Sequence, residues 1–336
     1  MSSTTPGLVA AELRKSYPGG RNAPRIQALD GLSIEVEAGT IFGLLGPNGA
    51  GKSTTVKILS TLSRAESGTA QVAGIDVARH PDKVRRVIGF VAQKAVADPV
   101  DTGRENLVLA GRLQGMRGGD ARARAAELLT RFSLTGAADR LVKTYSGGMA
   151  RKLDVAIGLM NRPQVLFLDE PTTGLDPEAR SEMWSELEAM AKVERMTVLL
   201  TTHYLEEADR LASRLAIVDH GRVVVTGSPE QLKDGLHGDA VIVELAPGAD
   251  AAEGLRLLER LPGLNEVLVD GRVLRSRAAS GAEALPQVLA ALDNARLGGA
   301  RLAVASATVA RPSLDDVYLR HTGHSYSAAA SEGANA

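Results

Sequence analysis

Apolar residues in the first two thirds of the chain fall into alternating stretches and short continuous runs, both typical of β-strands. The predicted strands are residues 8–17, 32–37, 41–46, 165–169 and 197–202. A turn-rich segment at 18–25 separates the first two of them. Because helical patterns alternate with the later runs, we predict an α/β fold whose largely parallel sheet is covered on both faces.

Helical spacing dominates the segment at about residues 100–160, which is rich in Arg, Ala and Leu. We therefore predict a mostly helical insert there. Other helices are predicted to begin at about Lys52, at Asp176-Pro177 and at Ser228-Pro229. In the last two cases an N-cap side chain precedes a proline, which is a favourable first residue of a helix.

Beyond residue 238 the order of elements becomes strand, helix, hairpin, helix and strand. These elements are predicted at 240–245, 251–261, 265–278, 283–295 and 301–310. The β-α-β-β-α-β order, with the hairpin turning at Asp270-Gly271, is that of a small α+β ferredoxin-like domain. We therefore expect a first domain at 1–238 and a second at 239–323. A tail at 324–336 should be disordered, since its last ten residues carry no bulky apolar group.

A last helix is predicted to begin at Pro312-Ser313. Leu314, Val317 and Tyr318 fall on one side of it as a narrow apolar stripe. The stripe suits docking against the first domain or another subunit, and it suits closing the core of its own domain equally well. The second domain is expected to serve assembly or regulation, because no candidate chemical group lies within it.

Composition narrows the class of protein without identifying it. The chain has 336 residues, a 44% hydrophobic share and a formal net charge of −1, so it can form a sizeable core and does not favour a nucleic-acid partner. It has no cysteine, which excludes disulfides and thiolate metal sites. No apolar run approaches the roughly 20 residues that span a bilayer, and the start does not resemble a signal peptide. Any membrane role is therefore expected to come through a partner.

The strongest chemical signal is GPNGAGKS at residues 46–53, which fits G-x-x-x-x-G-K-[ST] between a predicted strand and a predicted helix. Such a loop wraps phosphates with its backbone N–H groups, at the positive end of the helix dipole. Lys52 is expected to reach the β- and γ-phosphates, and the Ser53 hydroxyl to ligate Mg²⁺. The predicted nucleotide-binding residues here are Gly46, Pro47, Asn48, Gly49, Ala50, Gly51, Lys52, Ser53 and Thr54.

A second signal is VLFLDE at residues 165–170, where a buried strand ends in two carboxylates. Ligands of an α/β sheet bind at the carboxyl ends of its strands. Asp169 is expected to hold Mg²⁺ through water. Glu170 is placed to accept a proton from an attacking water molecule.

With YSGGM at 145–149 added to these motifs, residues 8–230 resemble the ATP-binding subunits of ABC transporters, whose signature is usually LSGGQ. The resemblance implies that Ser146, Gly147 and Gly148 contact the γ-phosphate of ATP held by a second subunit. Tyr145 and Met149 depart from the usual signature. The Ser-Gly-Gly core is intact, so the departures leave open only how the flanking side chains fit.

Further residues receive roles from the resemblance. Tyr17 resembles the aromatic residue that stacks on adenine, although it could also be a core tyrosine at a strand end. Gln93 is similar to the glutamine that senses Mg²⁺ and water, and Asp176 in GLDP to the aspartate that communicates across the dimer. His203, which follows an apolar strand, is similar to the switch histidine that contacts the γ-phosphate.

YSGGM and the ending RPSLDDVYLRHTG at 311–323 are similar to the daunorubicin-resistance type of drug-export ATPases. This implies a P-loop ABC ATPase domain with a helical subdomain at about 100–160, followed by the ferredoxin-like domain. It also implies ATP hydrolysis with Mg²⁺ that powers export of a lipophilic small molecule. The implied partners are a separate membrane-spanning permease and a second ATP-binding subunit, either an identical copy or a close paralogue. The implied location is the cytoplasmic face of the membrane.

Other functions of ABC proteins remain to be weighed. A soluble ABC ATPase that acts on nucleic acid or ribosomes is the main alternative. Against it, only about ninety residues separate the phosphate loop from YSGGM, too few for long coiled coils, and there is one phosphate loop. A non-catalytic module would lack Glu170 or His203, which are both present. The apolar loop AVADPV at 95–100 could contact a partner or pack against its own domain.

Overall fold

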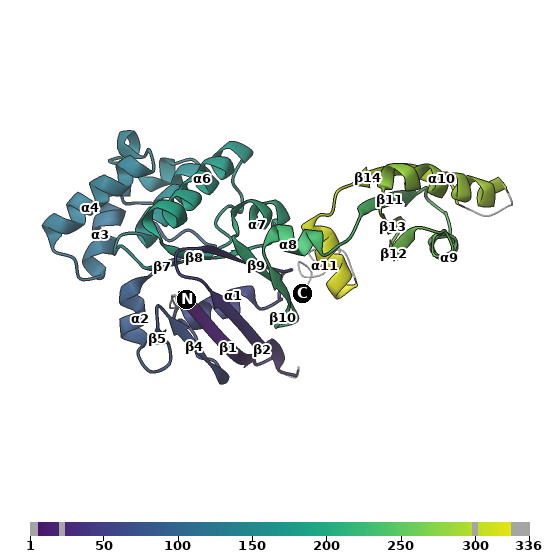
Figure 1. The fold of residues 1–336 in the computed structure, drawn as a ribbon. Helices are drawn as coiled ribbons and strands as arrows, with labels where there is room; N and C mark the ends of the chain where they lie inside the picture. Colours follow the sequence, from purple (N-terminus) through teal and green to yellow (C-terminus); the bar gives the residue numbers. More distant parts are fainter. Residues whose placement is uncertain (1–5, 20–23, 298–301, 324–336) are drawn as a thin grey trace. The chain divides into compact units, whose positions relative to one another are not determined.

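The computed structural model describes residues 6–19, 24–297 and 302–323 (Figure 1). The chain divides into two compact units, the first ending at Pro229 and the second beginning at Glu230. The predicted disordered tail at 324–336 lies outside the described residues.

The larger sheet of the first unit has the strand order β10-β9-β3-β8-β7-β6. Its strands are β3 (Ile41–Leu45), β6 (Ile88–Val91), β7 (Val165–Asp169), β8 (Thr197–Thr202), β9 (Arg214–Asp219) and β10 (Arg222–Gly227). All neighbouring pairs are parallel except β9 and β10. Every residue of β3, β7 and β8 is buried, as expected of strands covered on both faces. The predicted largely parallel sheet is confirmed.

Strands near the N-terminus form a separate antiparallel sheet of order β2-β1-β4-β5. They are β1 (Leu8–Tyr17), β2 (Ile26–Val36), β4 (Ser67–Val72) and β5 (Ile75–Asp76). The predicted strand at 32–37 is therefore the end of a longer one. Buried and exposed residues alternate over 32–36 at the end of β2, which leaves one face for the core and the other for solvent.

Two hydrophobic clusters cover the two faces of the larger sheet. Along β7, Leu166 and Leu168 belong to a cluster with the helices of residues 103–191, whereas Val165 and Phe167 belong to one with α1 (Lys52–Leu59) and the antiparallel sheet. Figure 1 shows α3, α4 and α6 on one side of β7 and β8, and β1, β2 and β4 on the other. Strand alternation thus divides one run of apolar residues between two cores.

The predicted helical insert is confirmed. It consists of α3 (Gly103–Leu113), α4 (Gly118–Arg131) and α5 (Gly147–Gly158), with short 3-10 turns before α5. The remaining helices of the first unit are α2 (Pro81–Val87), α6 (Pro177–Glu194) and α7 (Leu205–Leu211). Helix α6 begins as predicted, with the Asp176 side chain accepting a hydrogen bond from the N–H of Ala179.

The second unit has the predicted ferredoxin-like order of elements. These are β11 (Asp239–Leu245), α9 (Ala251–Leu258), β12 (Leu264–Asp270), β13 (Val273–Ala278), α10 (Gly281–Leu297) and β14 (Val304–Ala310), with α8 (Pro229–Asp234) before them and α11 (Leu314–Thr322) after them. Its antiparallel sheet has the order β12-β13-β11-β14. Val241 and Leu274 on one face pack with Leu258 of α9 and Leu292 of α10.

The other sheet face carries arginines that hold α11. Arg277 is buried, lies 3.4 Å from Asp316, and donates to the carbonyls of Leu236 and Gly238. Arg275 lies 3.2 Å from Asp315 and 3.3 Å from Asp316. Because residues 236–238 are bound to β13, the boundary falls at 229–230 rather than at the predicted 238–239.

The predicted apolar stripe of α11 is buried along its length: Leu314, Val317 and Tyr318 are each at most 2% exposed. The polar contacts of α11 with Arg275, Arg277 and the carbonyl of Gly235 all lie within the second unit. In the described ranges, no helix combines the length and the apolar character that crossing a bilayer requires.

We expect Asp316→Ala to destabilise the second unit by about 3 kcal/mol, because the buried Arg277 loses one of its two carboxylate partners, Asp316 and Glu266, and α11 loses its capping box. The matched change Asp315→Ala removes a more exposed carboxylate and should cost about 1 kcal/mol or less. Native-state hydrogen exchange of the β11 and β13 amides would measure both, separately from the first unit. Equal protection in the two variants would contradict this role of Asp316.

Candidate active site

The phosphate loop connects the end of β3 to the start of α1, as predicted. Two of its glycines are required by close backbone approach. Gly51 has φ +108°, and a Cβ there would lie 2.6 Å from the carbonyl oxygen of Ala28. A Cβ on Gly46 would lie 2.3 Å from the carbonyl oxygen of Val218. The loop therefore lies against the protein backbone with the N-terminal N–H groups of α1 at its end, an arrangement suited to phosphate.

Lys52 is buried with its ammonium group inside the loop. Its Nζ donates to the carbonyls of Gly46 at 2.7 Å and Pro47 at 3.1 Å. It also lies 3.9 Å from Oε1 of Glu170. Burial lowers the pKa of Lys52, and the charges of Glu170 and Asp169 oppose that effect. The amino group of Lys52 thus lies between the loop carbonyls and the Glu170 carboxylate.

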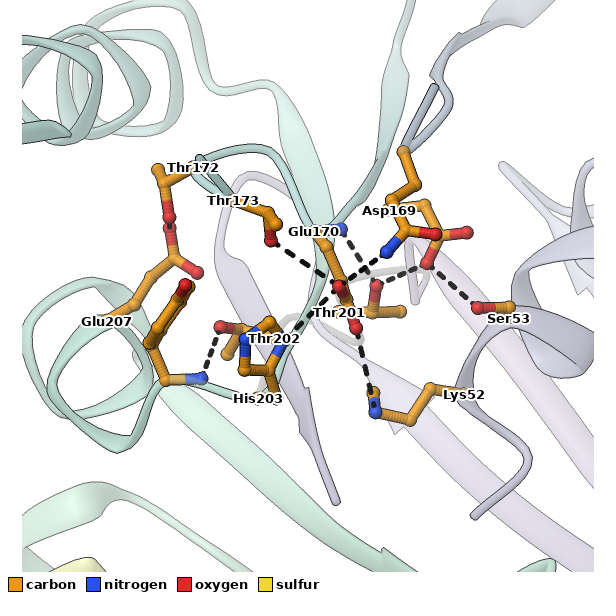
Figure 2. Close-up of polar contacts among 12 residues, drawn as sticks. Lys52, Ser53, Asp169, Glu170, Thr172, Thr173, Thr201, Thr202, His203 and Glu207 are labelled. Carbon is orange, nitrogen blue, oxygen red and sulfur yellow. Dashed lines mark hydrogen bonds and ion pairs between the residues drawn. The ribbon is translucent and has the colours of Figure 1, made fainter. Parts of the chain in front are cut away.

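Asp169 is joined to the phosphate loop by hydroxyl groups. Ser53 Oγ donates to Asp169 Oδ1 at 3.1 Å, and Thr201 Oγ1 donates to the same oxygen at 2.6 Å (Figure 2). A hydroxyl and a carboxylate are the hard oxygen ligands that Mg²⁺ prefers. Among the described residues, no group of three or more His, Cys, Asp or Glu could hold a metal by itself. Ser53 and Asp169 fit an ion that is held by few side chains together with substrate phosphates.

Glu170 lies at the centre of the site (Figure 2). Its Oε2 accepts a hydrogen bond from Gln93 Nε2 at 2.9 Å and lies 3.2 Å from Nδ1 of His203. The contact with His203 lowers the pKa of Glu170 most strongly, burial opposes this, and Lys52 and Thr173 lower the pKa further. The carboxylate is therefore ionised at neutral pH, which is the form that a general base requires.

Adjacent parallel strands bring these groups together. The phosphate loop follows β3, His203 follows β8, Glu170 follows β7, and Gln93 follows β6 after one residue. The four strands are neighbours in the order β3-β8-β7-β6, so their carboxyl ends meet at one edge. The sequence placed the phosphate loop, Glu170 and His203 at strand ends but did not predict β6 before Gln93, and the sheet order makes them one site.

The other predicted site residues lie at the starts of α5 and α6 and at the end of β1. Ser146 caps α5 by accepting from the N–H of Met149, and both Ser146 and Gly147 are exposed. Asp176 is exposed and caps α6. Tyr17 is half-buried at the end of β1, with Lys15 Nζ 5.4 Å from its ring centroid. The proposed roles of these residues toward ATP stay predictions.

The departures from the usual signature have local explanations. Tyr145 donates its hydroxyl to the carbonyl of Ala137 at 2.7 Å, and its ring end fills the space beside Gly103. Met149 packs against the core beneath the helices. The two side chains therefore anchor the start of α5 to its own unit.

Several residues that form hydrogen bonds with the site residues, or with residues near them in the chain, were not identified from the sequence. Thr201 orients Asp169 from the neighbouring strand, and its only signal was a hydroxyl in an otherwise apolar run. Glu207 is fully buried and accepts a hydrogen bond from Thr172 Oγ1 at 2.8 Å (Figure 2). It also accepts one from Trp184 Nε1 at 3.0 Å. Arg151 binds the backbone on both sides of Glu170, and its position one turn after the Ser-Gly-Gly core was the signal that could have found it.

Comparisons with known proteins agree with this geometry. A family model described as ABC transporter matches residues 29–173. The chain is 48% identical over 301 residues to the daunorubicin resistance ATP-binding protein DrrA2 of Streptomyces coeruleorubidus, covering 89% of this chain and 91% of that protein. It is 44% identical over 321 residues to the daunorubicin/doxorubicin resistance ATP-binding protein DrrA of Streptomyces peucetius, covering 95% and 93%.

A similar solved structure is the dimeric ATP-binding cassette MJ0796 in a post-hydrolysis state, bound to ADP and Pi. It is 26% identical, with a TM-score of 0.60, and covers 66% of this chain and 98% of that chain. The likeness is to the α/β cassette with mixed parallel and antiparallel sheets.

We expect Lys52→Ala to weaken ATP binding about ten- to a hundredfold, because a phosphate in the loop loses a charged hydrogen-bond donor. Ser53→Ala should weaken binding mainly when Mg²⁺ is present, since its hydroxyl serves the metal. Calorimetric titration with ATP in Mg²⁺ and in EDTA would measure both effects. Unchanged Mg·ATP affinity in both variants would refute the role of the loop.

Proposed function

Because this chain belongs to the ATP-binding proteins of ABC transporters, a family of ATPases, we propose that it powers a membrane exporter of lipophilic small molecules. The observation that carries the proposal is the meeting of Lys52, Asp169, Glu170, Gln93 and His203 at one sheet edge. The relatives that span about nine tenths of the chain carry names of daunorubicin and doxorubicin resistance, which supports a lipophilic drug or natural product as cargo.

The chemistry follows from the geometry of the site. The loop N–H groups and Lys52 hold the β- and γ-phosphates, while Asp169 and Ser53 would hold Mg²⁺. Mg²⁺, when bound with ATP, neutralises charge on the phosphate oxygens. Ionised Glu170 accepts a proton from water as the water oxygen bonds to the γ-phosphorus. The bond from the γ-phosphorus to the bridging oxygen breaks, which leaves ADP and phosphate.

Gln93 and His203 orient the reacting groups in this proposal. Both contact Oε2 of Glu170, so they fix the carboxylate beside the water position. Such positioning supplies much of the catalysis in phosphoryl transfer, where little covalent chemistry falls to the protein.

A second ATP-binding subunit completes the site in our proposal. The exposed Ser146 and Gly147 at the N-terminus of α5 offer a hydroxyl and N–H groups to a phosphate from another chain. The similar cassette MJ0796 is dimeric. Closure of two subunits around two Mg·ATP would supply the force for transport, and hydrolysis would reopen them.

We also propose that a separate permease subunit docks beside Gln93, at the cytoplasmic face of the membrane. A groove of about 740 Å³ on the first unit is lined in part by Leu62, Phe90, Leu113 and Ile157, which offer apolar surface to a partner. In the apolar loop that follows Gln93, Val96 is 51% exposed and Val100 is 65% exposed. This exposure favours contact with a partner over packing of the loop on its own domain.

The second unit serves assembly or regulation in this proposal, since each of the catalytic side chains lies in the first unit. A soluble ABC ATPase acting on nucleic acid or ribosomes is not favoured. Near full-length similarity is to proteins named for drug resistance.

The function is tested in proteoliposomes that contain the chain and its permease. Daunorubicin should stimulate ATP hydrolysis by the complex, and Glu170→Gln should lower turnover by about 10²–10⁴ while ATP still binds, because the general base is lost. Normal hydrolysis without any response to lipophilic drugs would refute the proposed cargo. Near-normal turnover of Glu170→Gln would refute the base assignment.

A substitution at Gly147 tests whether the signature acts on the partner's ATP. A Cβ at Gly147 meets nothing within 4 Å, whereas one at Gly148 would lie 2.9 Å from Cβ of Ala179 and strain its own subunit. Gly147→Asp should therefore keep ATP binding by the monomer but prevent ATP-driven dimer closure, since its carboxylate repels the γ-phosphate. Dimer closure would be measured by size-exclusion chromatography in the presence of ATP, with subunits that also carry Glu170→Gln.

The control is a mixture of Gly147→Asp with Lys52→Ala subunits. One composite site in that heterodimer retains both of its motifs, so partial closure should return. Undiminished closure of the Gly147→Asp homodimer would show that the signature does not act across the dimer.

A further inference from the structure

Arg151 is a buried arginine next to the backbone of the active site, and the proposed chemistry gives it no role. It lies on α5, five residues after Ser146, and is 7% exposed. Its Nε donates to the carbonyl of Pro171 at 2.6 Å, and its Nη2 lies within hydrogen-bond distance of the carbonyls of Asp169 at 3.3 Å and Glu170 at 3.2 Å. One guanidinium group thus binds three successive carbonyls around the general base.

The same guanidinium also binds the loop that carries Gln93. Nη1 of Arg151 donates to the carbonyl of Ala92 at 2.7 Å. Four of its five N–H groups are therefore assigned to backbone oxygens of two separate segments. A lysine could not reproduce this, because its donors diverge from a single nitrogen.

Asp154, one turn further along α5, holds the other end of that loop. Its Oδ1 accepts from the N–H groups of Val96 at 3.0 Å and Ala97 at 3.2 Å, and its Oδ2 lies 3.8 Å from Nη1 of Arg151. Arg151 and Asp154 bracket residues 93–95, so the position of Gln93 is set from α5.

The backbone at Glu170 needs such support. Glu170 has φ +50°, a left-handed conformation that is strained for a residue other than glycine. Strained conformations persist only where the surroundings determine them. Here the N–H of Glu170 donates to the carbonyl of Thr201 at 3.1 Å, and Arg151 holds the carbonyls on either side.

We propose that Arg151 is the positioning residue for hydrolysis, fixing Glu170 and Gln93 relative to each other from the helix that begins with the signature. The proposal rests on the proposed ATPase function of this site. The hydrogen bonds of Arg151 go to backbone carbonyls next to Glu170 and Gln93 rather than to the phosphate loop, so its effect falls on the hydrolysis step and not on ATP binding.

The test is Arg151→Lys in the full-length chain assembled with its permease. We expect kcat for ATP hydrolysis to fall about a hundredfold, the usual effect of misplacing a reacting group by about 1 Å. The KM for ATP and the calorimetric Kd should change by less than about twofold, since a separate loop binds the phosphates.

Arg124→Lys is the matched control. Arg124 is also buried, and its Nη2 donates at 2.9 Å to the carbonyl of Leu159 at the far end of α5. This variant should lose a comparable amount of thermal stability yet keep kcat within about twofold, because α5 is loosened away from Glu170.

Combination with Glu170→Gln separates positioning from general damage. If Arg151 acts through Glu170, Arg151→Lys should lower single-turnover hydrolysis little further in that background, whereas independent effects would multiply. Should Arg151→Lys not fold, Arg151→Met with Asp154→Asn removes both buried charges, and the same loss of kcat is expected.

Several outcomes would overturn the proposal while the wild-type complex hydrolyses ATP. They are a kcat within twofold of wild type, a loss of ATP affinity that parallels the loss of kcat, and a full multiplicative loss with Glu170→Gln. An inactive wild-type complex would instead count against the proposed function itself.

Discussion

Two carboxylates and a lysine are buried together in the first unit, and the rest of that unit depends on compensating them. Asp169, Glu170 and Lys52 are each at most 8% exposed. An uncompensated charge at such a depth costs several kcal/mol. Hydroxyl groups donate hydrogen bonds to Asp169. Glu170 is contacted by Gln93 and His203. Carbonyl groups of the phosphate loop accept hydrogen bonds from Lys52.

These compensating groups come from different strands, so the sheet must hold its register for the charges to be tolerated. A shift of β8 by one residue would turn Thr201 away from Asp169 and expose its apolar neighbours on the wrong face. The two hydrophobic cores on either side of β7 prevent such a shift. The apolar contacts that stabilise the sheet therefore lie on its faces, and the polar groups of the candidate site lie at the carboxyl ends of its strands.

The two faces of the sheet in the second unit are covered by different kinds of contact. One face of its sheet is covered by apolar contacts with α9 and α10, as in the first unit. The other face holds α11 through Arg275, Arg277 and Asp316. A charged contact of this kind specifies where a helix lies but adds less stability than apolar burial would.

The sequence by itself determined the local features. Alternation and apolar runs located the main strands, glycine and lysine spacing located the phosphate loop, and Asp176 and Ser313 located helix starts. The ferredoxin-like order also followed from local patterns, because each of its elements carries its own periodicity and turn signals.

Only the tertiary structure decided which of these features meet. The sequence predicted strands at 8–17 and 32–37 without assigning them to a sheet, and β1 and β2 pair in a separate antiparallel one. The local signals of Thr201 and Arg151 did not indicate their partners, yet Thr201 orients Asp169 and Arg151 holds the backbone of Glu170. Their roles arise from strand order and from the packing of α5, which depend on contacts between residues far apart in sequence. A short stretch of sequence encodes its own backbone preference and cannot encode which distant group will lie beside it.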